Sequence, residues 1–187
     1  MAYLDKASLD AMGFKSLGKD VKISDKASIY NPEMIEIGDY SRIDDFCVVP
    51  GQVSIGNYVH IAPFCLVAGG EPGITMEDFS GLAYGVQVFS QSDDYSGGTL
   101  TNPTVSDKYK KERKAKVYIG RHVIIGASAI VFPGIDLAEG CSVGAKALVV
   151  KSTQPWGIYA GNPARRIKDR KKSLLDLETQ FLKDQQK

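Results

Sequence analysis

The sequence is poor in the residues on which several large classes of protein depend. Its 187 residues include three cysteines and two histidines, and the charged side chains nearly cancel to a net charge of +1. Cys47, Cys65 and Cys141 form neither a disulfide framework nor a C-x-x-C metal pair. His60 and His122 cannot supply the three imidazoles of a zinc hydrolase within one chain, so we expect no metal. The near-neutral charge argues against a dedicated nucleic-acid binder.

Long apolar segments are also absent. No run approaches the ~18 residues of a membrane-spanning helix. The N-terminal residues lack the basic and apolar segments of a secretory signal, so we expect a cytoplasmic protein without integral membrane contact. With 43 % hydrophobic and 24 % charged residues, the composition is that of an ordinary folded domain, and the length suits a single core.

A repeat with a period of six residues is the dominant feature of the sequence. Large aliphatic side chains recur in four runs, and every member except Met76 is Ile, Val or Leu. Small or β-branched residues mostly follow four positions later, and all three cysteines fall in that second pattern, which predicts buried thiols rather than nucleophiles. The aliphatic positions are Leu17, Ile23, Ile29, Ile37, Ile43, Val49, Ile55, Ile61, Val67, Met76, Leu82, Val88, Ile119, Ile125, Val131, Leu137, Val143 and Val149.

A six-residue period is neither helical nor a long alternating strand. Short strands joined by tight turns, each with one large residue pointing inward, predict a coiled stack of parallel strands. With three hexapeptides per coil, the repeats make about six coils and a prism ~29 Å tall, because neighbouring strands lie ~4.8 Å apart. Six successive positions in phase, twice, argue against the alternative of a β-sandwich.

Two segments depart from the repeat and define the expected organisation. A loop at residues 90–116 interrupts the coils, and a long loop in an ordered repeat usually carries chemistry. Apolar residues at helical spacing near the end predict a C-terminal helix from about 165 to 184. We therefore expect an N-terminal segment with a short helix (1–16), a β-helix (17–164) containing the insertion, and a C-terminal helix and tail (165–187).

Three stretches carry a resemblance to a known family: residues 119–152, the coil exit PWGIYAGNPARRIKDR at 155–170, and the loop at 90–116. Together they resemble the hexapeptide acyltransferases, and among these the sugar and xenobiotic acetyltransferase branch. The resemblance implies an all-β, left-handed parallel β-helix that forms a homotrimer. It also implies acetyl-CoA as co-substrate, lying in the groove between neighbouring prisms.

The same resemblance indicates where coenzyme A would lie. Small residues at turns would let the amide-rich pantetheine approach the backbone, although these residues could serve only the bend. Cations near the coil exit would suit the phosphates, although a solvated basic segment is an equal alternative for each of them. The matching turn residues are Gly126, Ala127, Gly144 and Ala145. The matching exit residues are Asn162, Pro163, Arg165 and Lys168, with Arg166 and Lys151 as substitutes.

The sequence departs from this branch at its catalytic position. Sugar acetyltransferases of the branch usually carry a histidine at the start of the loop, whereas this sequence has Asp93 with Asp94 beside it. Either aspartate could be the general base, His60 could reach the site, or an amine acceptor could need no enzyme base. Both aspartates could instead cap the loop turn. The missing histidine favours an amine slightly.

Other polar residues receive weaker assignments. Tyr95 and Asn102 lie in the loop and could line the acceptor pocket, together with Pro103. The basic run at residues 108–116 could favour an anionic acceptor such as a nucleotide-linked sugar, although such runs are more often solvated. His122 is expected to be exposed and structural.

The expected function is therefore acetyl transfer from acetyl-CoA to a hydroxyl or amino group. The acceptor would be a bacterial cell-surface sugar or its nucleotide-linked precursor, as in polysaccharide biosynthesis. One alternative on the same scaffold is acetylation of an antibiotic or a small metabolite. The other is a β-helix that only binds or assembles.

Overall fold

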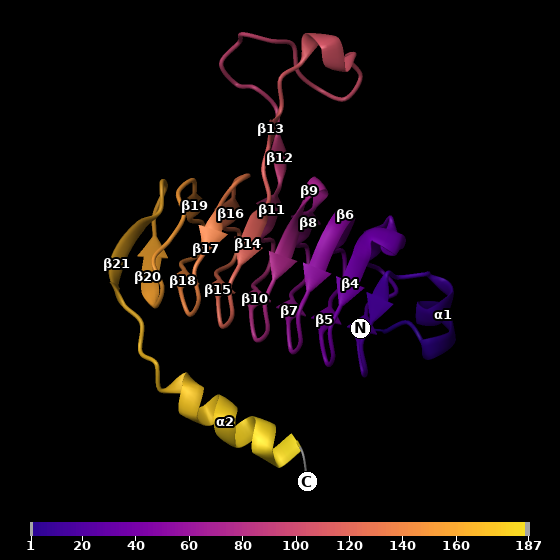
Figure 1. The fold of residues 1–187 in the computed structure, drawn as a ribbon, viewed down its shortest axis with the longest axis vertical. Helices are drawn as coiled ribbons and strands as arrows, with labels where there is room; N and C mark the ends of the chain where they lie inside the picture. The colour runs from indigo at the N-terminus through magenta and orange to yellow at the C-terminus, as the bar shows by residue number, and fades with distance from the viewer. Residues whose placement is uncertain (1, 186–187) are drawn as a thin grey trace.

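The structure is a computed structural model that describes residues 2–185. Its body is a parallel β-helix in which the chain winds through three strands per coil, so that three rows of stacked strands form three faces (Figure 1). The expected fold class is confirmed.

The first face contains seven parallel strands in stacking order. These are β2 (Lys22–Ile23), β5 (Arg42–Ile43), β7 (His60–Ile61), β10 (Gly81–Leu82), β15 (Ile124–Ile125), β18 (Ser142–Val143) and β20 (Gly157–Ala160). The second face contains β3 (Ser28–Tyr30), the start of β6 (Val48–Ile55), β8 (Leu66–Ala68), β11 (Gln87–Phe89), β16 (Ile130–Val131) and β19 (Leu148–Val149). The third face contains β1 (Ser16–Leu17), β4 (Ile35–Ile37), the end of β6, β9 (Gly70–Met76), β14 (Val117–Ile119) and β17 (Asp136–Leu137).

The first face shows one coil more than the six predicted from the repeats. The seventh inward position belongs to Tyr159 on β20, whose ring is 9 % exposed. A search restricted to aliphatic residues passes over it, because an aromatic side chain fills the end of the core here.

The core follows the predicted register closely. Nearly all the repeated aliphatic residues are buried, and so are Cys47, Cys65 and Cys141, as predicted. In the first coil Leu17 and Ile29 are only partly covered, whereas Ile23, whose carbonyl accepts a hydrogen bond from the Leu4 amide, is fully buried.

One edge of the prism, between the third and first faces, carries a ladder of rings. Stacked rings run from Tyr40 through Tyr58 and Phe79 to His122. Trp156 lies farther along the same edge, tilted by 40° with its ring centroid 6.4 Å from that of His122. Each of these residues has a positive φ between 55° and 59°. Ring stacking on successive coils offsets part of the cost of this left-handed conformation. His122 is therefore structural but only 7 % exposed, so the expectation of an exposed histidine is wrong.

The loop projects away from the prism on a short stalk (Figure 1). The stalk consists of β12 (Gln91–Ser92) paired antiparallel with β13 (Arg113–Lys114), and the tip contains the 3-10 helix η2 (Asp107–Tyr109). Lys114 reaches Glu71 on β9 at 3.0 Å, which ties the stalk to the coils. Two further short helices, α1 (Lys6–Ala11) and the 3-10 helix η1 (Pro32–Met34), lie near the N-terminal end.

The C-terminal segment differs from the prediction in its first part. Residues 165–169 form a strand, β21 (Arg165–Asp169), paired antiparallel with β20, and the helix α2 begins only at Leu174 and ends at Gln185. An unpaired strand edge at the end of the stack offers hydrogen bonds that a helix at 165 would leave unmade. Among residues 2–185, no helix is long and apolar enough to cross a membrane.

The helix α2 returns along the prism and contacts the ring ladder. Phe181 packs edge-on against Tyr58 and Phe79, with ring centroids 5.2 and 6.2 Å away. Glu178 contacts Arg121, and its Oε2 lies 2.8 Å from Nε2 of His122. These contacts hold α2 beside the first face.

Candidate active site

The loop and the coils border an open cavity of about 400 Å³ at the base of the stalk. Phe89 and Phe132 contribute aromatic walls, with ring centroids 6.2 Å apart in an edge-to-face arrangement. Asp93 and Glu112 contribute two carboxyl groups to a cavity that also includes Tyr95. This combination of rings and acids suits a ligand with a flat or apolar body and a cationic group.

The two loop aspartates, adjacent in sequence, have different surroundings. Asp94 accepts hydrogen bonds from the amide and hydroxyl of Ser96, both at 2.9 Å, and from the Thr99 hydroxyl at 3.2 Å. The backbone hydrogen bond from Ser96 is the main reason why the pKa of Asp94 is lowered. Asp94 therefore shapes the loop. The Asp93 side chain lines the cavity, and the one hydrogen bond it accepts within residues 2–185 is a long one, 3.4 Å, from the Asn102 amide.

The remaining loop candidates also separate into residues that line the cavity and residues that stabilise the loop. Tyr95 borders the cavity but is 87 % exposed. The Asn102 side chain accepts from the amide and hydroxyl of Thr104, so it organises a turn. Glu112 was not among the predicted site residues, because in the sequence it looks like the single acid within a basic run. Its pairing with Lys110 at 3.3 Å positions it at the cavity.

His60 lies on a different surface from Asp93. Its Nε2 is 2.8 Å from Oδ2 of Asp44, which also accepts from Arg42 at 2.8 Å. Burial raises the pKa of the Asp44 carboxyl, but the hydrogen bonds from Arg42 and His60 outweigh it, so the net shift is downward. His60 and Asp93 line separate cavities within one chain.

The predicted phosphate-binding cations partly converge. Lys151, Arg165 and Arg166 line a cavity of about 250 Å³ at the end of the prism, beside Tyr159. Lys168 is exposed on β21, outside that lining, and Asn162 and Pro163 are exposed between β20 and β21. No acid among residues 2–185 lines this cavity, although Arg166 pairs outside the lining with Asp169 at 2.6 Å. Lys151 and Arg165 therefore contribute most of the positive charge, which suits a phosphate-rich group.

The predicted pantetheine turns form one edge of the prism, between the first and second faces. Lys146 donates its amide to the Ala127 carbonyl, so these turns stack directly. A Cβ on Gly126 would lie 2.5 Å from the Ala145 amide, and one on Gly144 would lie 3.0 Å from the Ala160 Cβ. Stacking therefore accounts for Gly126, whereas Ala145 is exposed and free to face a ligand.

Comparison with known proteins gives a consistent picture. Residues 34–69 match the bacterial transferase hexapeptide family (six repeats). The chain is 42 % identical over 183 residues to dTDP-4-amino-4,6-dideoxy-D-glucose acyltransferase of Escherichia coli, covering 97 % of this chain and 95 % of that one. It is 41 % identical over only 59 residues to a chloramphenicol acetyltransferase of Klebsiella aerogenes, or 32 % and 28 % of the two chains.

A solved structure agrees over nearly the whole length. AntD, an N-acyltransferase from Bacillus cereus solved in complex with dTDP and 3-hydroxybutyryl-CoA, superposes with a TM-score of 0.97 at 45 % identity. The match covers 99 % of this chain and 98 % of that one.

Proposed function

Because this chain belongs to the hexapeptide-repeat acyltransferases, we propose that it acylates the amino group of a dTDP-linked 4-amino-4,6-dideoxy sugar, with acyl-coenzyme A as donor. The observation that carries the proposal is the nearly full-length match to two relatives. One is named for that acceptor, and the other, AntD, has been solved with dTDP and 3-hydroxybutyryl-CoA and, as a variant, with dTDP-4-amino-4,6-dideoxyglucose and coenzyme A. The match to an antibiotic acetyltransferase covers less than a third of that protein, so it supports shared coils rather than a shared acceptor.

The loop-base cavity supports an amine acceptor. The amine nitrogen would attack the thioester carbonyl, forming a C–N bond as the C–S bond breaks, and the departing thiolate can take the proton released by nitrogen. An amine is a much better nucleophile than a hydroxyl, so the step needs no strong enzyme base. Asp93 would bind the sugar amine, and Glu112, which lines the same cavity, would add negative charge nearby.

The donor would lie along the turns of Ala127 and Ala145, with its phosphates at the end cavity near Lys151 and Arg165. Acetyl-CoA is one donor that this arrangement would accept. We further infer a cytoplasmic homotrimer whose product feeds the synthesis of cell-surface polysaccharide. The trimer is supported by the separation of the donor turns and the loop-base cavity on different edges of one prism.

The acceptor assignment is tested by following thiol release from acyl-CoA. We expect turnover with dTDP-4-amino-4,6-dideoxyglucose and none with chloramphenicol. Turnover with chloramphenicol alone would contradict the proposal.

The role of Asp93 is tested by comparing Asp93→Asn with Asp94→Asn and His60→Asn at saturating acetyl-CoA. Asp93→Asn should raise the acceptor KM by about tenfold with kcat largely kept, because a lost binding contact acts on substrate affinity. Asp94→Asn and His60→Asn should change neither constant much. A kcat loss of about 10²–10⁴ in one of the three variants would assign a general base there and contradict the positioning role of Asp93.

A further inference from the structure

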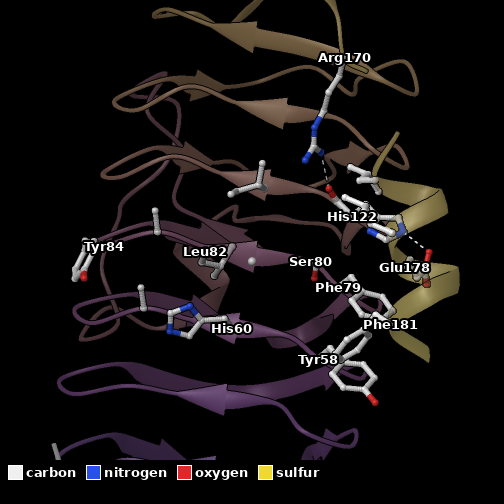
Figure 2. A pocket seen from close by; sticks show the side chains of 16 residues that line it. Tyr58, His60, Phe79, Ser80, Leu82, Tyr84, His122, Arg170, Glu178 and Phe181 are labelled. Carbon is white, nitrogen blue, oxygen red and sulfur yellow. Dashed lines mark hydrogen bonds and ion pairs between the residues drawn. The ribbon is translucent and has the colours of Figure 1, made fainter. Parts of the chain in front are cut away.

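A groove of about 730 Å³ crosses the first face between the stacked strands and α2, and the proposed reaction does not yet use it. Figure 2 shows Tyr84 at one end, His60 and Leu82 in the middle, and the rings of Tyr58, Phe79 and Phe181 at the other. Ile124 and Tyr84 are 50 % and 64 % exposed, so a large apolar surface borders the groove.

The floor of the groove is hollow at Gly81. The strands β7, β10 and β15 pair in register, so His60, Gly81 and Ile124 form one outward row. A Cβ on Gly81 would meet nothing nearer than the His60 carbonyl oxygen at 3.6 Å, an ordinary contact. Neither coil stacking nor a positive φ requires glycine at this position. The missing side chain therefore leaves an apolar slot between His60 and Ile124.

The slot has one oriented polar group, the His60 imidazole. Its Nε2 donates to Asp44, because an ionised carboxylate only accepts. In neutral imidazole the Nδ1 lone pair is then left as an acceptor. Asp44 itself is 1 % exposed and held by Arg42, so the ring orientation is fixed from below.

The slot continues the proposed donor track. Ser128 donates its amide to the Tyr84 carbonyl, and Lys146 to that of Ala127, so Tyr84 lies one coil beyond Ala127 on the same edge. Pantetheine descending past Ala145 and Ala127 would bring its thioester to the coil of Tyr84. The next coil, which carries His60, is ~4.8 Å away, close to the reach of a four-carbon acyl chain.

We propose that the slot over Gly81 holds the acyl chain of the donor, and that it selects a chain longer than acetyl with a hydroxyl on carbon 3. The hydroxyl donates its hydrogen bond to His60 Nδ1, while the half-exposed Ile124 contacts the alkyl carbons. This inference rests on the proposed acyl transfer and names its donor class.

The slot is tested by filling it. Gly81→Val adds a side chain that strands favour, at an outward position with room for its Cβ. We expect kcat/KM for 3-hydroxybutyryl-CoA to fall about 10- to 100-fold, the usual range for a blocked apolar pocket, with that for acetyl-CoA kept. Lys22→Val, on the same face in the first coil, is the matched control and should change neither value.

The polar end is tested by His60→Gln. In the native enzyme, 3-hydroxybutyryl-CoA should exceed butyryl-CoA in kcat/KM by about tenfold, and His60→Gln should bring that ratio close to one. Activity with acetyl-CoA should persist. An equal loss with all three donors would give His60 a catalytic or general structural role and overturn the proposal.

Two further outcomes would also overturn it. In the first, the native enzyme prefers acetyl-CoA, and Gly81→Val does not change the ratio of kcat/KM between 3-hydroxybutyryl-CoA and acetyl-CoA. Alternatively, Gly81→Val could change the sedimentation coefficient, which would make the groove a contact between copies of the chain. The proposed function is contradicted by a different result, namely that no acyl-CoA reacts with the dTDP-linked amino sugar.

Discussion

At the residue scale, small residues on the coils serve different physical purposes. Gly126 has no room for a Cβ, because the next coil's backbone lies 2.5 Å from where that atom would be. Gly81 has room, and its missing side chain shapes a surface instead. In the sequence both positions are simply glycine. Only the structure shows which glycine is required for coil stacking and which leaves space for a ligand.

Ala145 gives a direct test of the donor track. We expect Ala145→Trp to raise the Kd of coenzyme A more than about tenfold, equivalent to about 1.4 kcal/mol, because the exposed indole would occupy the pantetheine path. The melting temperature should stay within a few degrees, since the side chain points to solvent. Calorimetric titration measures the first and thermal denaturation the second.

Asp25→Trp is the control, because Asp25 is exposed on the same edge in the first coil, far from the track. Unchanged coenzyme A affinity in Ala145→Trp would move the donor site elsewhere.

The sequence locates the loop aspartates but cannot rank them. Because they are adjacent in sequence, Asp93 and Asp94 are equally good candidates for the acceptor site. In the structure, only the Asp94 carboxylate accepts hydrogen bonds from Ser96 and Thr99, which gives it a structural role in the loop. Glu112 illustrates the opposite case, because the loop brings it back to the cavity of Asp93, from which it is 19 positions away in the sequence. Contacts of that range leave no local pattern in the sequence.

At the element scale, the strands of the coils are predictable and the C-terminal segment is less so. Each strand needs only one inward aliphatic residue and a turn, so six-residue spacing fixes the register. Ile167 shares a helical apolar spacing with Leu174, Leu177 and Phe181, yet residues 165–169 pair with β20, because the last coil would otherwise present an open edge. The helix α2 therefore begins only at Leu174.

The docking of α2 depends on Glu178, whose side chain is 11 % exposed between Arg121 and His122. Glu178→Gln should weaken docking by about 1–3 kcal/mol, the usual effect of losing hydrogen bonds to a charged group. Amide hydrogen exchange across residues 174–185 should speed up, while the coils stay protected, since local opening is independent of the core.

Asp176→Asn makes the same chemical change on an exposed turn of α2 and serves as the control. Its effect on exchange should be much smaller. Equal acceleration in both variants would show that Glu178 does not anchor the helix.

At the scale of the whole molecule, the proposed donor track and the proposed acceptor cavity lie on different edges of one chain. The loop-base cavity lies where the second face leads into the stalk, whereas the proposed donor track follows the edge between the first and second faces. Figure 1 shows the loop standing clear of its own prism. A loop from one subunit facing the track of the next would bring amine and thioester together.

We therefore expect sedimentation equilibrium to give three times the chain mass of 20.3 kDa. The stronger test is complementation between two impaired variants. Asp93→Asn damages only the loop side of each site, and Ala145→Trp damages only the donor side. In randomly mixed trimers, refolded together in equal amounts, about a quarter of the shared sites receive an intact loop from one chain and an intact track from another.

Activity in the mixture should then rise above that of either variant alone, toward about a quarter of the native value measured at an acceptor concentration well below KM. Each variant refolded by itself is the control for recovery of folded protein. If both sides of the site came from the same chain, every site would carry one lesion. The mixture would then show only the mean of the two separate activities, even though the protein sediments as a trimer.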